Sequence, residues 1–208
     1  MSNTLPFAAE GILVPLTTPL HRFTVDEYYA LAASGALAAD ARVELLDGLI
    51  YEMSPIGAEH AYTVERIDKR LLGKLLPGGW HTRMQHPIQF GNNEPQPDIC
   101  VVRGELVDFR RRHPQAGDVA LVIEVADATL AMDRAKAKLY AAAGIPEYWI
   151  MNLPARQLEV FRQPGTDDEG RPKYNQVQIF KPGAEVTLDL AEATLGPLQI
   201  DMLLPPAE

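Results

Sequence analysis

The chain has 208 residues, and 47% of them are hydrophobic, which is typical of a packed globular core and excludes disordered and fibrous architectures. Its 28 acidic and 19 basic residues give a formal net charge of -9, which disfavours a general nucleic-acid coat protein because such a charge repels a polyanion. The same charge is compatible with an enzyme that gathers acidic side chains around a metal ion.

The sequence shows neither a candidate membrane span nor a signal pattern. Its longest apolar stretches, such as Val119 to Val125, are broken by a charge well before the roughly 18 residues that a span needs. The lone cysteine, Cys100, has no partner for an internal disulfide, and we interpret it as a small core residue. We therefore expect a soluble cytoplasmic protein without membrane contact.

The N-terminal region predicts an arm followed by a helix. Residues 1–22 are rich in Pro, Thr and small apolar residues without clear periodicity, so we expect an arm that carries no chemistry. Thr24 and Glu27 form a capping-box pattern, and apolar residues then recur at helical spacing. The pattern predicts a helix of about four turns that ends between Gly35 and Asp40.

A hairpin, a second helix and a strand are predicted next. Alternation from Val43 to Met53 is interrupted by Asp47-Gly48, a turn signal that predicts a β-hairpin. Residues Glu59 to Leu76 predict an amphipathic helix, and Trp80 to Phe90 alternates as a strand. The apolar stripe of this helix comprises Tyr62, Val64, Ile67, Leu71 and Leu75, and its basic face, which we expect to be solvated, comprises Arg66, Lys69, Arg70 and Lys74.

The rest of the chain predicts strands around a third helix. Pro97 to Val102 and Ala120 to Val125 are mostly apolar runs, typical of strands covered on both faces. No repeat or linker composition divides the chain, so we predict one domain over residues 23–204 with an α/β or α+β fold built on a mixed sheet. The other expected elements are a helix from about Asp133 to Ala143, strands at 147–151, 158–163 and 174–181, and short strands and turns over 186–204.

Two acidic residues fall inside the apolar runs. Asp98 and Glu124 each need an explanation, because burying an ionised carboxylate without a partner costs several kcal/mol or more. A divalent cation would account for both, since Mg²⁺ takes oxygen ligands and commonly uses one or two protein carboxylates. The alternative for each acid is a solvated or salt-bridged position at the end of a strand.

The third helix adds charged side chains close to these acids. Asp133, Arg134, Lys136 and Lys138 lie within two turns, and a lysine beside a metal site can orient or deprotonate the attacking water or stabilise a phosphate. Lys136 and Lys138 are separated by about 200° around a helix axis, so only one of them can point at the site. The alternative is that the whole run is a solvated helix face.

Several short segments occur together in a recognisable order. They are Pro97-Asp98, Glu124-Val125, a lysine on the following helix and Tyr140 to Trp149, accompanied by Phe23 to Tyr28, Val43 to Gly48, Glu52 to Pro55 and Gln85 to Ile88. This combination resembles the Uma family of restriction-endonuclease-like proteins, a large bacterial family, expanded in cyanobacteria, within the PD-(D/E)XK nuclease superfamily. The resemblance extends from Phe23 to about Leu204.

The resemblance implies a restriction-endonuclease-like core, a mixed β-sheet flanked by helices, and metal-dependent hydrolysis of phosphodiester bonds. It implies that Asp98 and Glu124 hold Mg²⁺ or Mn²⁺, that Glu44 is a further acid near the metal, and that Gln85 lines the site. Nucleic acid, with DNA expected, is the implied substrate. A homodimer is expected by analogy with related nucleases, in which two sites cut two strands.

The position of the lysine differs from the usual superfamily pattern. Two residues after the second acid, where the superfamily usually places its lysine, this chain has Ala126. The family pattern instead selects Lys136, four residues before Tyr140, with Lys138 as the second choice. The interval from Asp133 to Tyr140 is a residue shorter than in many relatives, so the register of the lysine is open.

Two further polar residues are candidates for the site. His60, at the start of the second helix, could reach a phosphate or could simply be half-exposed, and Asp127 is a possible extra acid. The remaining histidines lack metal-ligand spacing, so we expect no zinc site. Tyr140, Tyr148 and Trp149 are interpreted as core residues.

No P-loop, GxGxxG or GxSxG motif is present, which argues against familiar kinases, dehydrogenases and serine hydrolases.

The sequence therefore predicts a metal-dependent endonuclease. In this hypothesis, Asp98 and Glu124 bind Mg²⁺ or Mn²⁺ while Lys136 positions the attacking water or stabilises charge. The rival hypothesis is a catalytically idle interaction or regulatory protein that retains the nuclease fold, because a fold alone does not establish turnover.

Overall fold

The computed structural model describes residues 19–38 and 40–206, apart from the side chains of Arg70 and Leu71. Residues 1–18 of the expected N-terminal arm lie outside this range. Within the described residues, no helix is both long enough and apolar enough to cross a membrane.

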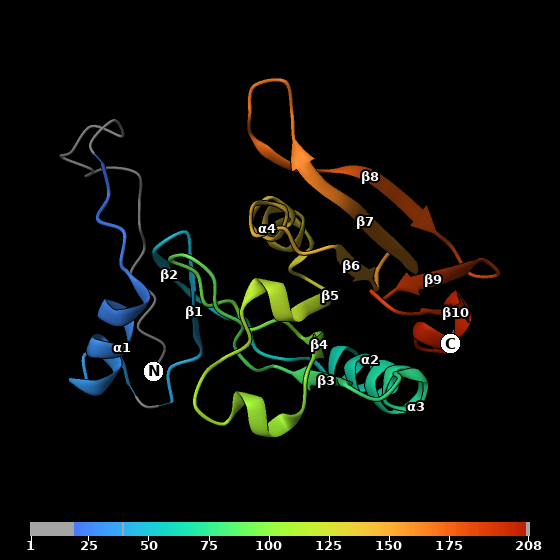
Figure 1. Ribbon diagram of the computed structural model, residues 1–208, viewed down its shortest axis with the longest axis horizontal. Helices are drawn as coiled ribbons and strands as arrows, with labels where there is room; N and C mark the ends of the chain where they lie inside the picture. The colour runs from blue at the N-terminus through green and yellow to red at the C-terminus, as the bar shows by residue number, and fades with distance from the viewer. Residues whose placement is uncertain (1–18, 39, 207–208) are drawn as a thin grey trace.

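A six-stranded mixed sheet forms the centre of the molecule, with the strand order β3-β4-β5-β6-β7-β8 (Figure 1). Only β5 and β6 are parallel, and α4 (Leu130–Ala142) connects them as a crossover. All other neighbours in this sheet are antiparallel. The strands are β3 (Trp80–Met84), β4 (Ile99–Arg103), β5 (Val119–Ala126), β6 (Glu147–Asn152), β7 (Gln157–Thr166) and β8 (Pro172–Phe180).

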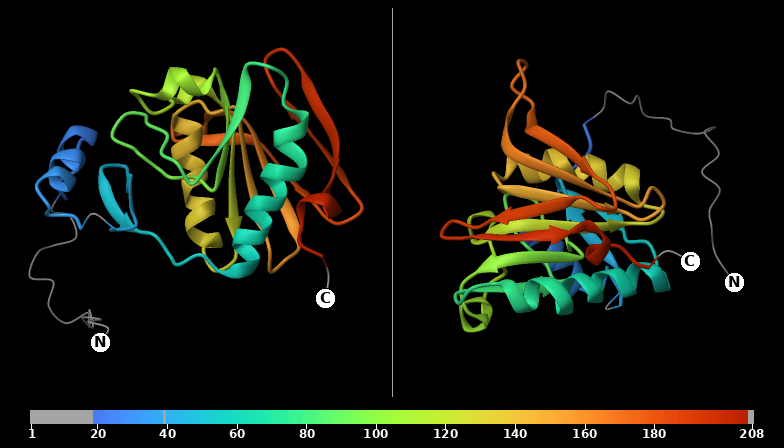
Figure 2. Two further views of the ribbon diagram at one scale, coloured as in Figure 1. Left: turned by 90° about the horizontal axis from the view of Figure 1, so that it is seen from below. Right: turned by 90° about the vertical axis from the view of Figure 1, so that its right-hand side faces the viewer.

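Helices cover both faces of the sheet, as the continuous apolar strands predict. Successive side chains of a strand point to opposite faces, so Leu121 and Ile123 of β5 pack with α2 (Ala58–Ile67), whereas Val122 packs with Tyr140 of α4. Figure 2, right, shows α2 and α4 on opposite sides of the strands. Every residue of β5 is buried, Glu124 included.

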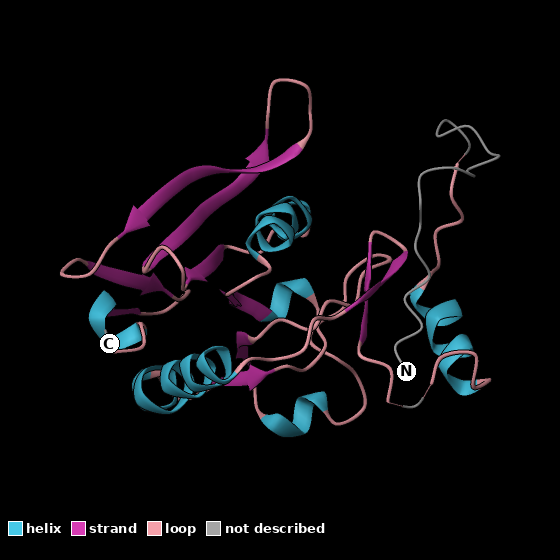
Figure 3. Cartoon of the chain, turned by 180° about the vertical axis from the view of Figure 1, so that it is seen from behind, coloured by secondary structure: helices cyan, strands magenta, loops and turns pink. Residues whose placement is uncertain are grey.

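A smaller two-stranded sheet completes the core on the α2 side. It consists of β9 (Glu185–Asp189) and β10 (Thr194–Gln199), and the one-turn helix α5 (Ile200–Leu203) follows it. Buried Leu188, Leu198 and Ile200 from this unit join the same apolar cluster as Val64 and Ile67 of α2. In Figure 3 this C-terminal unit lies at the end of the molecule opposite α1.

The N-terminal helix and a β-hairpin form a separate cluster at the other end. Helix α1 (Val25–Ala33) packs Val25 and Tyr28 against Leu45 of the hairpin made by β1 (Val43–Leu46) and β2 (Leu49–Glu52). Backbone hydrogen bonds between Leu45 and Glu94 tie the hairpin to the loop that leads to β4. Tyr29 of α1 donates to the buried Glu94 carboxylate at 2.7 Å, so α1, hairpin and loop are joined.

The first two predicted elements have the expected kinds of structure. The Thr24 and Glu27 capping box is present, with both reciprocal hydrogen bonds. The helix ends at Ala33, however, and is therefore shorter than four turns. The hairpin forms around Asp47-Gly48, where both residues adopt positive φ, as the turn signal predicts.

The second helix is not the single amphipathic helix that the stripe predicts. It is interrupted by a π-helical segment, η1 (Asp68–Leu72), before the short α3 (Gly73–Leu75). Within α2 the buried face includes Thr63 rather than the exposed Tyr62, and beyond α2 the wider π turn leaves Leu72 buried and Leu75 exposed. Of the basic face, Lys69 pairs with Glu65 and Arg66 donates to backbone carbonyls of α5, and neither lines either of the two cavities described below.

Other boundaries shift where local geometry overrides alternation. The strand expected to reach Phe90 ends at Met84, because Gln85 adopts a positive φ of 52° and turns the chain. Helix α4 begins at Leu130, three residues before the expected start, and β7 and β8 extend further into their connecting loop than predicted. The helix α5 was not anticipated.

The burial of β5 generates a stability prediction. Ile123 is 0% exposed and Ile179 on the edge strand β8 is 57% exposed. We expect Ile123→Ala to lower the free energy of unfolding by about 2–5 kcal/mol, because it leaves a cavity. The matched variant Ile179→Ala should change it by less than about 0.5 kcal/mol. Urea unfolding measures both, and equal losses would contradict the sheet arrangement.

Candidate active site

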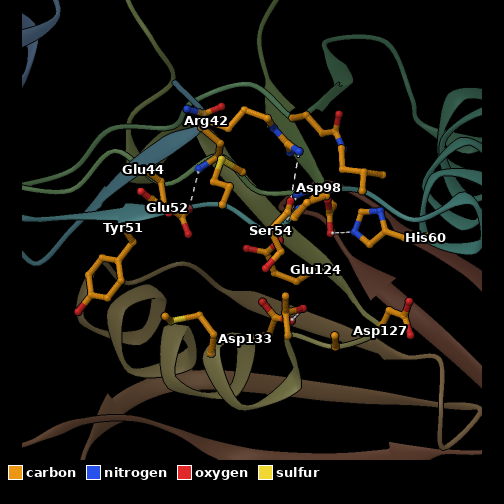
Figure 4. A pocket seen from close by; sticks show the side chains of 18 of the residues that line it. Arg42, Glu44, Tyr51, Glu52, Ser54, His60, Asp98, Glu124, Asp127 and Asp133 are labelled. Carbon is orange, nitrogen blue, oxygen red and sulfur yellow. Dashed lines mark hydrogen bonds and ion pairs between the residues drawn. The ribbon is translucent and has the colours of Figure 1, made fainter. Parts of the chain in front are cut away.

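Acidic side chains from four separate segments face one cavity of about 390 Å³ (Figure 4). Glu44 comes from β1, Asp98 from the residue before β4, Glu124 from β5 and Asp133 from α4. These four residues are named the acid cluster below. The cavity is bounded by the hairpin, the start of α2, the central strands and the start of α4.

Two members of the acid cluster are locked together by neighbouring strands. The backbone amide of Asp98 donates to Glu124 Oε2 at 3.2 Å, and the amide of Val125 donates to Asp98 Oδ2 at 2.8 Å. The antiparallel register of β4 and β5, in which Ile99 is opposite Ile123, brings these groups together. The sheet therefore fixes the relative position of the two carboxylates.

Lys136 lies between two members of the acid cluster. Its Nζ is 2.9 Å from Glu44 Oε1 and 3.1 Å from Glu124 Oε1, and its side chain is only 7% exposed. Tyr140, one turn further along α4, donates to the same Glu124 oxygen at 3.1 Å. Helical spacing of four residues places both side chains on the face of α4 that covers β5. Lys138 is exposed and does not line this cavity.

His60 approaches the acid cluster from the opposite side. Its Nε2 is 2.9 Å from Asp98 Oδ2, and it lies in the first turn of α2. Burial disfavours the charged ring, yet the hydrogen bond and charge of Asp98 outweigh burial and raise the pKa of His60. The His60 Nδ1 atom is buried without a hydrogen-bond partner among the described residues.

The cavity is lined by more acidic than basic side chains. Burial, together with Asp98, Asp133 and Glu44, raises the pKa of Glu124 to about 8 despite the opposing effect of Lys136. Burial also raises the pKa of Asp133, whose Oδ2 accepts a hydrogen bond from Thr129 at 2.6 Å. For Lys136, burial favours the neutral amine, but Glu124 and Glu44 outweigh it and raise its pKa. The lysine is charged, but this one cation does not offset all the acids around it, so Glu124 retains a proton at neutral pH that a bound cation would displace.

This charge imbalance fits a divalent cation. The donors are carboxylate oxygens, the type that Mg²⁺ and Mn²⁺ prefer, and Asp98 Oδ1 accepts no hydrogen bond from any described residue. Over the described residues, no three or more His, Cys, Asp or Glu side chains are grouped as a ready-made metal centre. Magnesium sites commonly need only one or two protein carboxylates, so a pair such as Asp98 and Glu124 is sufficient.

The remaining sequence candidates lie around the same cavity. Gln85 and Asp127 both line it, and the positive φ of Gln85 marks the turn that places it there. Cys100 is buried in the core, where burial raises the pKa of its thiol to about 12. Tyr148 and Trp149 are core residues as expected, whereas Tyr140 is buried but also contacts Glu124.

One cation of the site was missed by the sequence analysis. Arg42 lines the cavity, is exposed, and donates to the Ser54 carbonyl oxygen at 3.2 Å. Among the described residues no carboxylate lies within ion-pair distance of it. Its position directly before the hairpin, in Arg42-Val43-Glu44, was the only available signal.

Comparison with known families identifies the fold. Residues 25–201 match the model of the Uma2 family, described as "putative restriction endonuclease". The chain belongs to this family. No curated protein sequence matches the chain.

A solved structure supports the Uma2 assignment at the level of the fold. It is a protein of Anabaena variabilis described as a "putative nuclease belonging to DUF820". The similarity has a TM-score of 0.67 at 16% sequence identity, and it covers 89% of this chain and 97% of the other. The predicted restriction-endonuclease-like fold is confirmed by these two findings.

The two helix lysines provide a matched test of the site. In metal-free buffer, Lys136→Met should lower the free energy of unfolding by about 3–5 kcal/mol, because it leaves buried carboxylates without their cation. Lys138→Met, on the exposed face, should change it by less than about 0.5 kcal/mol. The Lys136→Met loss should be smaller at pH 6 than at pH 9, because Glu124, with its pKa raised to about 8, carries a proton at pH 6 and a negative charge at pH 9. Equal losses for the two variants in urea unfolding would refute this geometry.

Proposed function

We propose that this protein is an endonuclease that hydrolyses phosphodiester bonds in DNA and requires Mg²⁺ or Mn²⁺. The observation that carries the proposal is the contact of the buried Lys136 with Glu124 and Glu44, beside Asp98, in one open cavity. Membership of a nuclease family supports the reaction class. The metal and the DNA substrate are proposals that rest on the chemistry of the acid cluster.

Asp98 and Glu124 are the proposed metal ligands. Their carboxylates are already held at a fixed spacing by backbone amides, so little reorganisation is needed on binding. When bound, the ion polarises the phosphate and lowers the pKa of the attacking water. Tyr140 and Lys136 hold Glu124 in orientation, because both donate to its Oε1 atom.

Lys136 is proposed to act as a cation rather than as a general base. The carboxylates of Glu124 and Glu44 raise its pKa, so the amine keeps its proton at neutral pH. A charged amine beside the reacting phosphate stabilises the additional negative charge of the transition state and orients the attacking water by a hydrogen bond. Glu44 positions the amine from the side opposite Glu124.

Arg42 is proposed to bind the DNA backbone at the mouth of the cavity. A chain with net charge -9 needs local cations to bind a polyanion, and a guanidinium matches a phosphate with paired donors. Arg42 offers such donors next to the acid cluster.

We also propose a homodimer, because two sites are needed to sever both strands of a duplex.

A nuclease assay tests the proposal. Wild-type protein with Mg²⁺ or Mn²⁺ should cleave DNA, and chelation should abolish cleavage. Asp98→Asn, Glu124→Gln and Lys136→Met should each lower kcat/KM by at least about 100-fold, as expected when a preorganised charge is removed from a transition-state site. The control Asp168→Asn, in the exposed turn between β7 and β8, should cleave at the wild-type rate.

Two results would overturn this function. One is the absence of metal-dependent cleavage of plasmid, linear and single-stranded DNA by the wild type, which would favour a non-catalytic interaction protein. The other is equal activity of Asp98→Asn and the wild type after identical purification, which would indicate a contaminating nuclease.

Metal binding can be measured without turnover. Mg²⁺ should raise the melting temperature of the wild type, and more at pH 8.5 than at pH 6. Below its pKa of about 8, Glu124 carries a proton that the ion must displace. Asp98→Asn and Glu124→Gln should lose the shift and Asp168→Asn should keep it. An unchanged shift in both site variants would remove these residues as ligands.

A further inference from the structure

A second cavity adjoins the acid-lined one. It has a volume of about 360 Å³ and lies between the β1–β2 hairpin and α4, with Pro172 of β8 at its edge. Tyr51, Met132 and Lys136 line both cavities, so the two hollows share a wall. The two cavities are therefore neighbours, close enough for one nucleotide chain to contact both.

The second cavity differs in chemistry from the first. Its lining is mostly apolar, and its one acidic residue, Asp47, is paired with Arg22 at 2.6 Å. Its cations are Lys136, shared with the acid cluster, and the exposed Lys138, which has no ion-pair partner among the described residues. The apolar and aromatic lining comprises Leu46, Tyr51, Met132, Ala135, Leu139, Ala142 and Pro172.

We propose that this cavity binds the nucleobase next to the scissile phosphate, with Tyr51 as its stacking surface and Lys138 at the following phosphate. This inference rests on the proposed function and adds a substrate class to it. A nucleotide carries an anionic phosphate beside a flat, largely apolar ring. The two adjoining cavities match this order, because the proposed cation site of the first lies beside the apolar lining of the second. Half-buried Tyr51, whose ring points away from the acid cluster in Figure 4, makes no side-chain hydrogen bond to any described residue.

The size and position of the cavity support this occupant. Pockets for small ligands measure about 300–1,000 Å³ and combine apolar walls with a few polar groups, as this one does. Aromatic side chains accept any base by stacking, and a lysine binds a phosphate without reading the sequence. Because the cavity adjoins the acid cluster through Tyr51, Met132 and Lys136, the base that it holds is one adjacent to the cut rather than one elsewhere on the strand.

Binding of a base in the second cavity limits which DNA structures can be substrates. A base that enters the cavity cannot remain paired and stacked in a duplex, so it must be unpaired or be turned out of the helix. The preferred substrate is therefore single-stranded DNA, or a duplex that is opened beside the cut. Fully paired duplex should be cleaved more slowly under the same conditions.

An abasic series tests the inference through activity. Single-stranded oligonucleotides each lack one base at a successive position around the cut. For the wild type, one position next to the cut should lower kcat/KM by about 10-fold, the size of one base–aromatic stack, and the other positions should have little effect. Tyr51→Ala should lose this position dependence, Tyr51→Phe should keep it, and Tyr62→Ala, outside both cavities, should match the wild type.

A second readout does not depend on turnover. The same oligonucleotides carrying 2-aminopurine at one position are bound without divalent metal, and base fluorescence is recorded. A change confined to one position, lost in Tyr51→Ala and kept in Tyr51→Phe, supports the base site even if no cleavage occurs, in which case only the nuclease proposal fails. Cleavage with equal abasic effects everywhere, or effects that survive in Tyr51→Ala, overturns the base site while the nuclease proposal stands. Absence of both signals overturns both.

Discussion

The buried charge of Lys136 is the constraint on which the arrangement of the site depends. A lysine that is 7% exposed requires compensating carboxylates, and these come from two elements far apart in the sequence, Glu44 in the hairpin and Glu124 in β5. The ion pairs therefore join helix, sheet and hairpin at a single point. The excess of acidic over basic side chains that remains is what makes the cavity suitable for a cation rather than a purely structural ion-pair network.

The sheet and the hairpin supply different parts of this arrangement. The carboxylates of Asp98 and Glu124 accept hydrogen bonds from the backbone amides of Val125 and Asp98, and the register of β4 and β5 fixes the positions of these amides. Glu44 lies on the β1–β2 hairpin. The contacts that attach this hairpin to the rest of the molecule include the Glu44–Lys136 ion pair and the backbone hydrogen bonds between Leu45 and Glu94. The two proposed metal ligands are thus held by the central sheet, whereas Glu44 is held by the peripheral hairpin.

Sequence alone predicted the parts of the site that depend on local patterns. Acids in apolar strands singled out Asp98 and Glu124, and the Asp47-Gly48 turn located the hairpin that carries Glu44. Whether Lys136 or Lys138 faces the cavity depends on the rotation of α4 against β5, which is a tertiary property. Arg42 gave no periodic signal, and the contact of His60 with Asp98 joins residues from separate elements. The strand end at Met84 depended on one positive φ at Gln85, which alternation cannot reveal.

The π-helical segment Asp68–Leu72 divides one long helix into two parts with different rotational phase. The first part carries His60 toward Asp98, and Leu72, the last residue of the π segment, packs in the apolar core. A π turn is equivalent to one residue inserted into an α-helix, and its effect is confined to the residues that follow it. The orientation of His60 toward Asp98 is therefore independent of how the residues after the π segment pack. A substitution that shifts one of them need not shift the other.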